Sequence, residues 1–249
     1  MGIKPELRKV LLIGQEGSGK THFIGTMPKP IFLFSLDKGY ATLAGEPGIR
    51  VCYVAEEDRR RPKAYREFED RFKAIAAGEK YKWPDGKEEL YATIAIDPLT
   101  CLSTFIFDHY QGINSNVDKK ASYTEYQLIL SKTQDILNKC IRISPHIVCT
   151  ALTRVDKDEL TGEIFYLADM IGSVREALGA WFDAVLYMRV EKTSEGQPKY
   201  QALTVGTRRQ KAKLRIPSGI KAGVLPVEIP DYRVIKEKID KAYVKKEGK

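Results

Sequence analysis

Residues 14–21 have the composition and spacing of a phosphate-binding loop. They read GQEGSGKT and match the pattern G-x-x-x-x-G-K-[ST] at every fixed position. In such a loop the glycines let the backbone turn its N–H groups toward phosphates, the lysine reaches the β- and γ-phosphates, and the threonine hydroxyl binds Mg²⁺. We therefore predict ATP and Mg²⁺ as cofactors, with nucleotide contacts from Gly14, Gln15, Glu16, Gly17, Ser18, Gly19, Lys20, Thr21 and His22.

Two acids follow apolar runs that read as buried strands. Asp97 comes directly after residues 93–96, and Asp37 after residues 31–36. Because the carboxyl ends of parallel strands meet at one edge of a sheet, both acids are expected beside the phosphate loop. Asp97 is predicted to hold Mg²⁺ together with Thr21; the alternative is a strand-end acid that caps the helix at Leu99. Asp37 either orients the attacking water or is a turn residue before Lys38.

Thr150 or Thr153 follows a further strand at residues 147–149 and is predicted to sense the γ-phosphate. The predicted catalytic set is thus Lys20, Asp37, Asp97 and Thr150.

The elements around these residues have to place them at one edge. A buried strand at residues 9–13 precedes the loop, and a helix is expected from about Gly19 to Met27. Further on, strands alternate with helices until about residue 190, after which the pattern becomes mostly strand. This order predicts an α/β fold with a mostly parallel central sheet flanked by helices and antiparallel C-terminal strands. We expect a single domain over residues 1–249, with a basic, β-rich extension from about 185.

The composition excludes several classes of protein. Hydrophobic residues make up 43% and charged residues 30% of the 249. No apolar run approaches the roughly 18 residues that cross a bilayer, and the charged N-terminus does not resemble a signal peptide. The four cysteines have no paired spacing, and the three histidines are scattered. These features predict a cytoplasmic protein with reduced thiols and no membrane partner.

The positive charge is concentrated at the C-terminal end. Residues 189–249 hold 16 Lys and Arg against 7 Asp and Glu, whereas the whole chain has a net charge of +8. Residues 208–215 read RRQKAKLR, which at strand periodicity aligns four cations on one face: Arg209, Lys211, Lys213 and Arg215. Such a row suits a DNA backbone or the γ-phosphate held by an adjacent subunit. The alternative is a charged edge strand that discourages aggregation.

Two loops are further candidates for DNA contact. Residues 112–122 contain Lys119 and Lys120 between Tyr110 and Tyr123, and aromatics beside cations suit stacking on unpaired bases. The alternative for the tyrosines is packing at helix ends. The loop after Thr153 is the second candidate.

Several classes of P-loop protein remain open. Residues 153–156, TRVD, resemble the guanine-reading TKxD motif of GTPases, although Asp97 is followed by Pro-Leu-Thr rather than by the glycine of a DxxG motif. Residues 59–61 are three arginines that would suit the lid of a small-molecule kinase. A nucleotide-dependent assembly protein with little hydrolysis is a further alternative.

The order of GQEGSGKT, IFLFSLDKG, ATIAIDPLT, HIVCTALT and the late basic segment resembles a phage family. These are RecA-like nucleotide-binding proteins, which include the Sak-type single-strand annealing ATPases, and the resemblance covers residues 8–235. It implies an ATPase with a RecA-like core that binds single-stranded DNA and promotes annealing in phage recombination. It also implies a homo-oligomeric ring or filament in the host cytoplasm, with a single-stranded-DNA-binding protein as a further partner. Asp37 stands where such proteins usually carry a catalytic glutamate, so slow or DNA-stimulated hydrolysis is expected.

Overall fold

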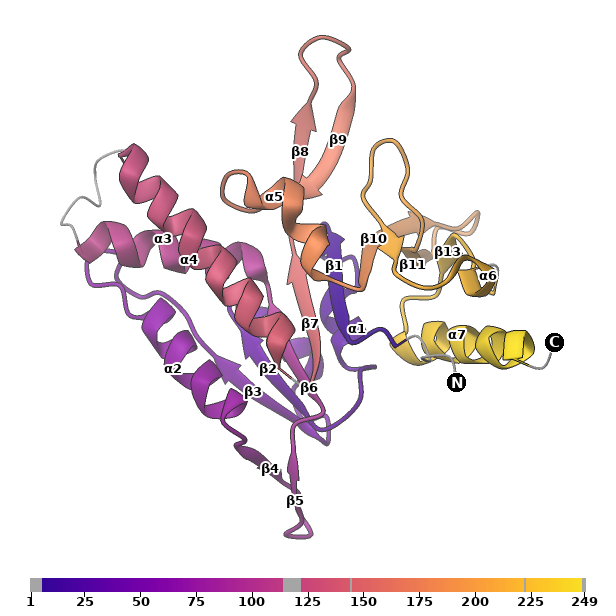
Figure 1. The fold of residues 1–249 in the computed structure, drawn as a ribbon, viewed down its shortest axis with the longest axis horizontal. Helices are drawn as coiled ribbons and strands as arrows, with labels where there is room; N and C mark the ends of the chain where they lie inside the picture. The colour runs from indigo at the N-terminus through magenta and orange to yellow at the C-terminus, as the bar shows by residue number, and fades with distance from the viewer. Residues whose placement is uncertain (1–5, 114–121, 144, 222, 248–249) are drawn as a thin grey trace.

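A twisted, mostly parallel sheet runs through the molecule (Figure 1). The computed structural model describes residues 6–113, 122–143, 145–221 and 223–247. Within these ranges the sheet has nine strands in the order β13-β11-β10-β1-β7-β6-β2-β3, with β12 also paired to β10. The strands are β1 (Lys9–Gly14), β2 (Ile31–Ser35), β3 (Ile49–Tyr53), β6 (Thr93–Asp97), β7 (His146–Ala151), β10 (Ala184–Lys192), β11 (Pro198–Leu203), β12 (Lys213–Leu214) and β13 (Val227–Glu228).

The central strands are parallel and apolar because both of their faces are covered. Every residue of β1, β2 and β6 is buried, as expected for strands with helices on both sides. In β1, Leu11 lies opposite Cys149 of β7 on one side and Val185 of β10 on the other. Among the described strands of this sheet, the antiparallel pairings are those of β11 and β12 with β10 and of β13 with β11. The predicted α/β fold class is therefore confirmed, including its antiparallel extension.

Helices cover the two faces of the sheet separately. On one face α2 (Ala64–Ala76), α3 (Leu99–Ile113) and α4 (Tyr123–Arg142) pack against side chains such as Ile13 and Phe34. On the other face α1 (Lys20–Ile24), α6 (Ser218–Lys221) and α7 (Tyr232–Glu247) pack against Leu12 and Leu33. Short helical segments follow β2 and β9: η1 (Lys38–Leu43), α5 (Val174–Ala177) and η2 (Leu178–Trp181). No helix in the described ranges is both long and apolar enough to cross a membrane.

Two hairpins extend from the sheet in opposite directions (Figure 1). The first consists of β4 (Lys80–Lys82) and β5 (Glu88–Leu90), joined by a turn at Trp83-Pro84-Asp85-Gly86. The second consists of β8 (Thr153–Lys157) and β9 (Ile164–Ala168) and replaces the plain loop expected after Thr153. The turn of this second hairpin carries Asp158, Glu159 and Glu163, so its tip is unsuited to contact phosphodiesters.

The C-terminal quarter departs from the sequence-based expectation. It ends in the 16-residue helix α7 rather than in strands. The basic row at residues 208–215 is not a continuous strand, because only Lys213 and Leu214 pair with β10. The residues before them form a turn in which Thr207 accepts hydrogen bonds from the N–H groups of Arg209 and Gln210. The expected strand periodicity therefore does not order these cations.

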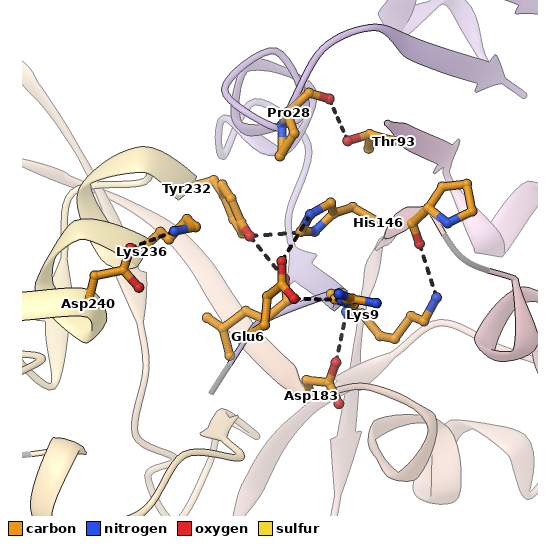
Figure 2. A network of polar contacts seen from close by, with 12 residues as sticks. Glu6, Lys9, Pro28, Thr93, His146, Asp183, Tyr232, Lys236 and Asp240 are labelled. Atoms are coloured by element: carbon orange, nitrogen blue, oxygen red, sulfur yellow. Dashed lines mark hydrogen bonds and ion pairs between the residues drawn. The ribbon is translucent and has the colours of Figure 1, made fainter. Parts of the chain in front are cut away.

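A polar network fixes α7 and the first strand at the lower edge of the sheet (Figure 2). The Tyr232 hydroxyl donates to the Leu7 carbonyl at 3.2 Å and lies 3.5 Å from His146 Nδ1. The Lys9 N–H donates to Asp183 at 3.0 Å, and its ammonium donates to the Ile143 carbonyl at 2.8 Å. This second bond gives a donor to the carbonyl of Ile143, the residue that follows α4.

Candidate nucleotide-binding site

Three glycines shape the loop between β1 and α1, for two different reasons. Gly17 and Gly19 have φ angles of 70° and 86°, in the left-handed region that favours glycine. Gly14 is needed for space, since a Cβ there would lie 2.5 Å from the Met188 carbonyl oxygen of β10. The predicted loop is thus formed by backbone conformations and a close strand approach that other residues would disturb.

The Lys20 ammonium folds back over this loop. Its Nζ donates to the carbonyls of Gly14 at 2.8 Å and Gln15 at 2.7 Å, and the side chain is buried. Burial lowers the pKa of Lys20, whereas the carboxylates of Asp97, Asp37 and Glu16 oppose that shift. An anionic phosphate beside the ammonium would favour its charged form in the same way.

Asp97 lies at the centre of a hydrogen-bonded triad. Thr21 Oγ1 donates to one carboxylate oxygen at 2.7 Å, and Thr150 Oγ1 donates to the other. The three residues come from α1, β6 and β7, which meet because β7 lies between β1 and β6. Burial raises the pKa of Asp97, and the two hydroxyl hydrogen bonds act in the opposite direction.

The pair of Thr21 and Asp97 fits Mg²⁺ chemically. Both offer hard oxygen ligands, which Mg²⁺ prefers, and Mg²⁺ usually takes one or two protein ligands together with substrate phosphates and waters. No cluster of three or more His, Cys, Asp or Glu suited to a metal occurs among the described residues. An ion held by Thr21, Asp97 and a bound triphosphate needs no such cluster.

Thr150 has a different position from the one expected. It is fully buried behind Asp97 and does not line the cavity described below, so direct contact with a γ-phosphate is not supported. Its hydroxyl instead orients the carboxylate that faces Thr21. Thr150 is therefore a positioning residue in this geometry.

Asp37 lies beside Thr21 at the same sheet edge. Ser35 of β2 is in register with Asp97 of β6, and Asp37 follows two residues later. Its carboxylate accepts the Gly39 N–H at 2.7 Å and so caps η1, as the turn alternative predicted. A Cβ at Gly39 would lie 2.9 Å from Asp37 Oδ1 and 3.4 Å from Thr21 Oγ1. Asp37 therefore has both a capping contact and a place in the site.

These groups line a cavity of about 780 Å³. Seven consecutive residues of the loop and helix, Glu16 to His22, contribute to it, together with Asp37 and Asp97. The sequence had not indicated the remaining lining residues, which are Gly39, Thr42, Pro98, Leu152, Tyr200, Ile229, Pro230 and Asp231. Tyr200 and Ile229 come from the antiparallel extension, so no local sequence pattern links them to the loop.

A second hollow, of about 590 Å³, is lined by three of the four predicted C-terminal cations. Lys211, Lys213 and Arg215 line it together with Arg175, whereas Arg209 does not. Lys211 donates to the Glu176 carbonyl at 3.2 Å and Arg215 to the Ala180 carbonyl at 2.7 Å. Burial lowers the pKa of Lys213, and the positive charge of Arg215 adds to that effect. Lys119 and Lys120 lie outside the described residues.

Three comparisons place this chain beside known proteins. The sequence model described as "AAA domain" matches residues 6–216. Among solved structures, the flagellar accessory protein FlaH from Methanocaldococcus jannaschii is similar, with 10% identity, a TM-score of 0.41, and coverage of 85% of this chain and 89% of that one. A search of curated proteins gave no match.

Proposed function

The chain belongs to the AAA domain family, and from that premise we propose that it is a RecA-like, Mg²⁺-dependent ATPase that acts on single-stranded DNA. The observation that carries the ATPase half is the Asp97 carboxylate, bonded to Thr21 at the mouth of the loop that holds Lys20. An ammonium, a hydroxyl and a carboxylate are thereby positioned around one cavity before any ligand arrives. Such preorganised charge is the main means by which proteins accelerate phosphoryl transfer.

In this proposal the chain's own residues have separate tasks. The loop amides and Lys20 bind the triphosphate, and Thr21 with Asp97 holds Mg²⁺, which supplies charge neutralisation on the phosphates. Thr150 keeps the Asp97 carboxylate oriented. Asp37 is the candidate that orients the attacking water, and its short side chain is consistent with slow hydrolysis.

The DNA half rests on charge and shape. The hollow lined by Arg175, Lys211, Lys213 and Arg215 has one acid, Glu176, in its lining. A concave surface with this excess of cations concentrates phosphate-bearing partners. We extend the proposal to annealing of complementary strands by a homo-oligomer, in which the same cations either contact DNA or reach the nucleotide of an adjacent subunit.

The two rival enzyme classes have less support. The TRVD residues that resemble a guanine-reading motif lie in β8, outside the lining of the cavity, and Asp156 is 3.7 Å from Arg175. Arg59, the first residue of the possible kinase lid, is bound at 2.6 Å by the buried Asp108 of α3. Neither motif therefore faces the nucleotide cavity.

The test combines hydrolysis and DNA binding in the same preparation. Phosphate release from ATP should require Mg²⁺ and rise when unlabelled single-stranded oligonucleotide is added. Fluorescence anisotropy of a labelled oligonucleotide should show binding that weakens as salt increases, because phosphate contacts release counterions. Preference for GTP would contradict the ATPase assignment, and absence of oligonucleotide binding at low salt, with and without ATP, would remove the DNA half.

A further inference from the structure

The lining of the nucleotide cavity has two chemically different parts. Lys20, Thr21 and Asp97 contribute polar and charged groups, whereas Tyr200, Ile229 and Pro230 contribute apolar atoms. In the sheet, β11 and β6 lie two strands away from β1 on opposite sides. The strands that carry Tyr200 and Asp97 are thus four spacings, about 19 Å, apart, with the phosphate loop between them.

Tyr200 contacts the loop itself. A Cβ added at Gly19 would lie 3.2 Å from Tyr200 Cδ1 and 3.7 Å from its Cε1, so the ring packs against the last glycine before Lys20. The pairing of β10 with β11 holds Tyr200 opposite Val190 and fixes its position. Even so, 46% of the residue is exposed and it lines the cavity. A ring that is held on one side and open on another can accept a flat ligand.

The neighbouring residues add apolar surface rather than hydrogen-bonding groups. Ile229 is 65% exposed, and it also lines the cavity. The carboxylate of the adjacent Asp231 is already held by Arg233, at 2.6 Å from Nη2 and 3.1 Å from Nε. The part of the lining around Tyr200 and Ile229 therefore offers apolar surface for stacking rather than a pattern of hydrogen-bond donors and acceptors specific to one base.

We propose that Tyr200 and Ile229 form the nucleobase platform of the cavity and take the apolar face of a purine. This inference rests on the proposed nucleotide-binding function and adds the residues that recognise the base. Because larger rings stack over more area, the platform favours purine over pyrimidine triphosphates. It also connects the antiparallel extension to nucleotide binding, a role that neither the phosphate loop nor Asp97 requires.

The test compares ATP with inorganic tripolyphosphate, which has the phosphates but no base. Calorimetric titration in the presence of Mg²⁺ would use the wild type, Tyr200→Ala, Tyr200→Phe and Ile229→Ala. Tyr200→Ala should weaken ATP binding by about tenfold or more and leave tripolyphosphate binding unchanged. Tyr200→Phe should retain ATP affinity, and Ile229→Ala, at an exposed site where folding is not at risk, should lose a smaller part of it. The ratio of ATP to CTP affinity should fall toward one in Tyr200→Ala.

The opposite outcomes are distinct. Equal weakening of ATP and tripolyphosphate in Tyr200→Ala would mean that the ring only supports the loop, and the platform would be rejected. Unchanged ATP binding in both alanine variants would also reject it, as would a wild type that binds tripolyphosphate as tightly as ATP. A wild type that binds neither ligand would overturn the proposed function itself.

Discussion

Thr21 and Asp97 are joined by a 2.7 Å hydrogen bond although 76 positions separate them in the sequence. The bond connects the helix that starts after the phosphate loop to the end of a strand two places away in the sheet. A divalent ion at this point would receive the hydroxyl and the carboxylate as neighbouring ligands. The first prediction concerns this pair.

Asp97→Asn should abolish Mg²⁺-dependent hydrolysis while leaving the fold intact. The amide oxygen still accepts from one threonine hydroxyl and the amide NH2 can donate to the other, but the side chain no longer offers a charged ligand. The rate should fall at least about 100-fold, because metal stabilisation of phosphoryl transfer is worth several kcal/mol. Phosphate release at saturating ATP measures it. Asp85→Asn, in the turn of the β4–β5 hairpin, is the matched control and should hydrolyse ATP like the wild type.

Lys20→Ala should lose nucleotide affinity without unfolding. Charge-assisted hydrogen bonds contribute about 1.5–3 kcal/mol, so binding of ATP should weaken by about 10- to 100-fold. Lys38→Ala removes an exposed lysine next to Asp37 and should bind ATP normally. Titration of a fluorescent ATP analogue measures both. An unchanged dissociation constant in Lys20→Ala would contradict the role assigned to the ammonium.

Asp37→Asn should separate hydrolysis from binding. Asparagine can still accept the Gly39 N–H, so the cap of η1 is kept, but it orients and deprotonates water poorly. The rate constant should fall by about 10²- to 10⁴-fold, the usual contribution of a general base, with ATP affinity unchanged. If hydrolysis persists at the wild-type rate, Asp37 has only its capping role.

A double substitution tests the basic hollow. Lys211→Ala with Lys213→Ala should weaken oligonucleotide binding and reduce its salt dependence. The slope of log K against log salt should decrease by about 1.4 for two lost contacts to single-stranded DNA. DNA-stimulated hydrolysis should fall more than ATP binding. Lys82→Ala, an exposed lysine of β4, is the control, and equal effects in both variants would count against a specific surface.

Stability should depend on pH through His146 at the lower edge of the sheet. Burial lowers the pKa of His146, although the nearby Glu6 opposes the shift; Lys9, Arg8 and Tyr232 also face this region. Below an unfolded pKa of about 6.5, the unfolded chain binds a proton that the folded chain does not, so the free energy of unfolding falls as pH falls. Thermal unfolding at about pH 7.5 and 5.5 should show a larger decrease in Tm for the wild type than for His146→Gln. Equal decreases would show that His146 does not contribute.

Local chemistry in the sequence was sufficient to place the loop at residues 14–21, Asp97 and Asp37 at one edge of the sheet. The spacing of Gly14, Lys20 and Thr21 predicts the conformation of the loop. Asp97 and Asp37 were predicted because each follows an apolar run that reads as a buried strand. The hydrogen bond from Thr150 to Asp97 could not be predicted, because it depends on β7 lying between β1 and β6. Tyr200 could not be found, since its contact with Gly19 depends on how β10 and β11 pair in space.

The sequence of α7 contains apolar residues at helical spacing, but they were not used to predict a helix. Tyr232, Ile235 and Ile239 are buried at helical spacing, yet this segment was expected to be part of a basic, β-rich extension. In the basic row, alternating cations suggested a strand, but the turn at Thr207 takes precedence because it satisfies backbone N–H groups locally.

The packing of α7 also limits which truncations of the basic C-terminal segment leave the rest of the fold unchanged. Tyr232 packs edge-on against Phe23 of α1, and its N–H donates to Thr26 Oγ1 at 2.9 Å. Truncation of the chain before α7 would expose the face of α1 against which Tyr232 packs, and α1 carries Lys20 and Thr21. Shortened versions intended only to remove positive charge would therefore also disturb the helix that carries Lys20 and Thr21, so the charge is better changed one side chain at a time.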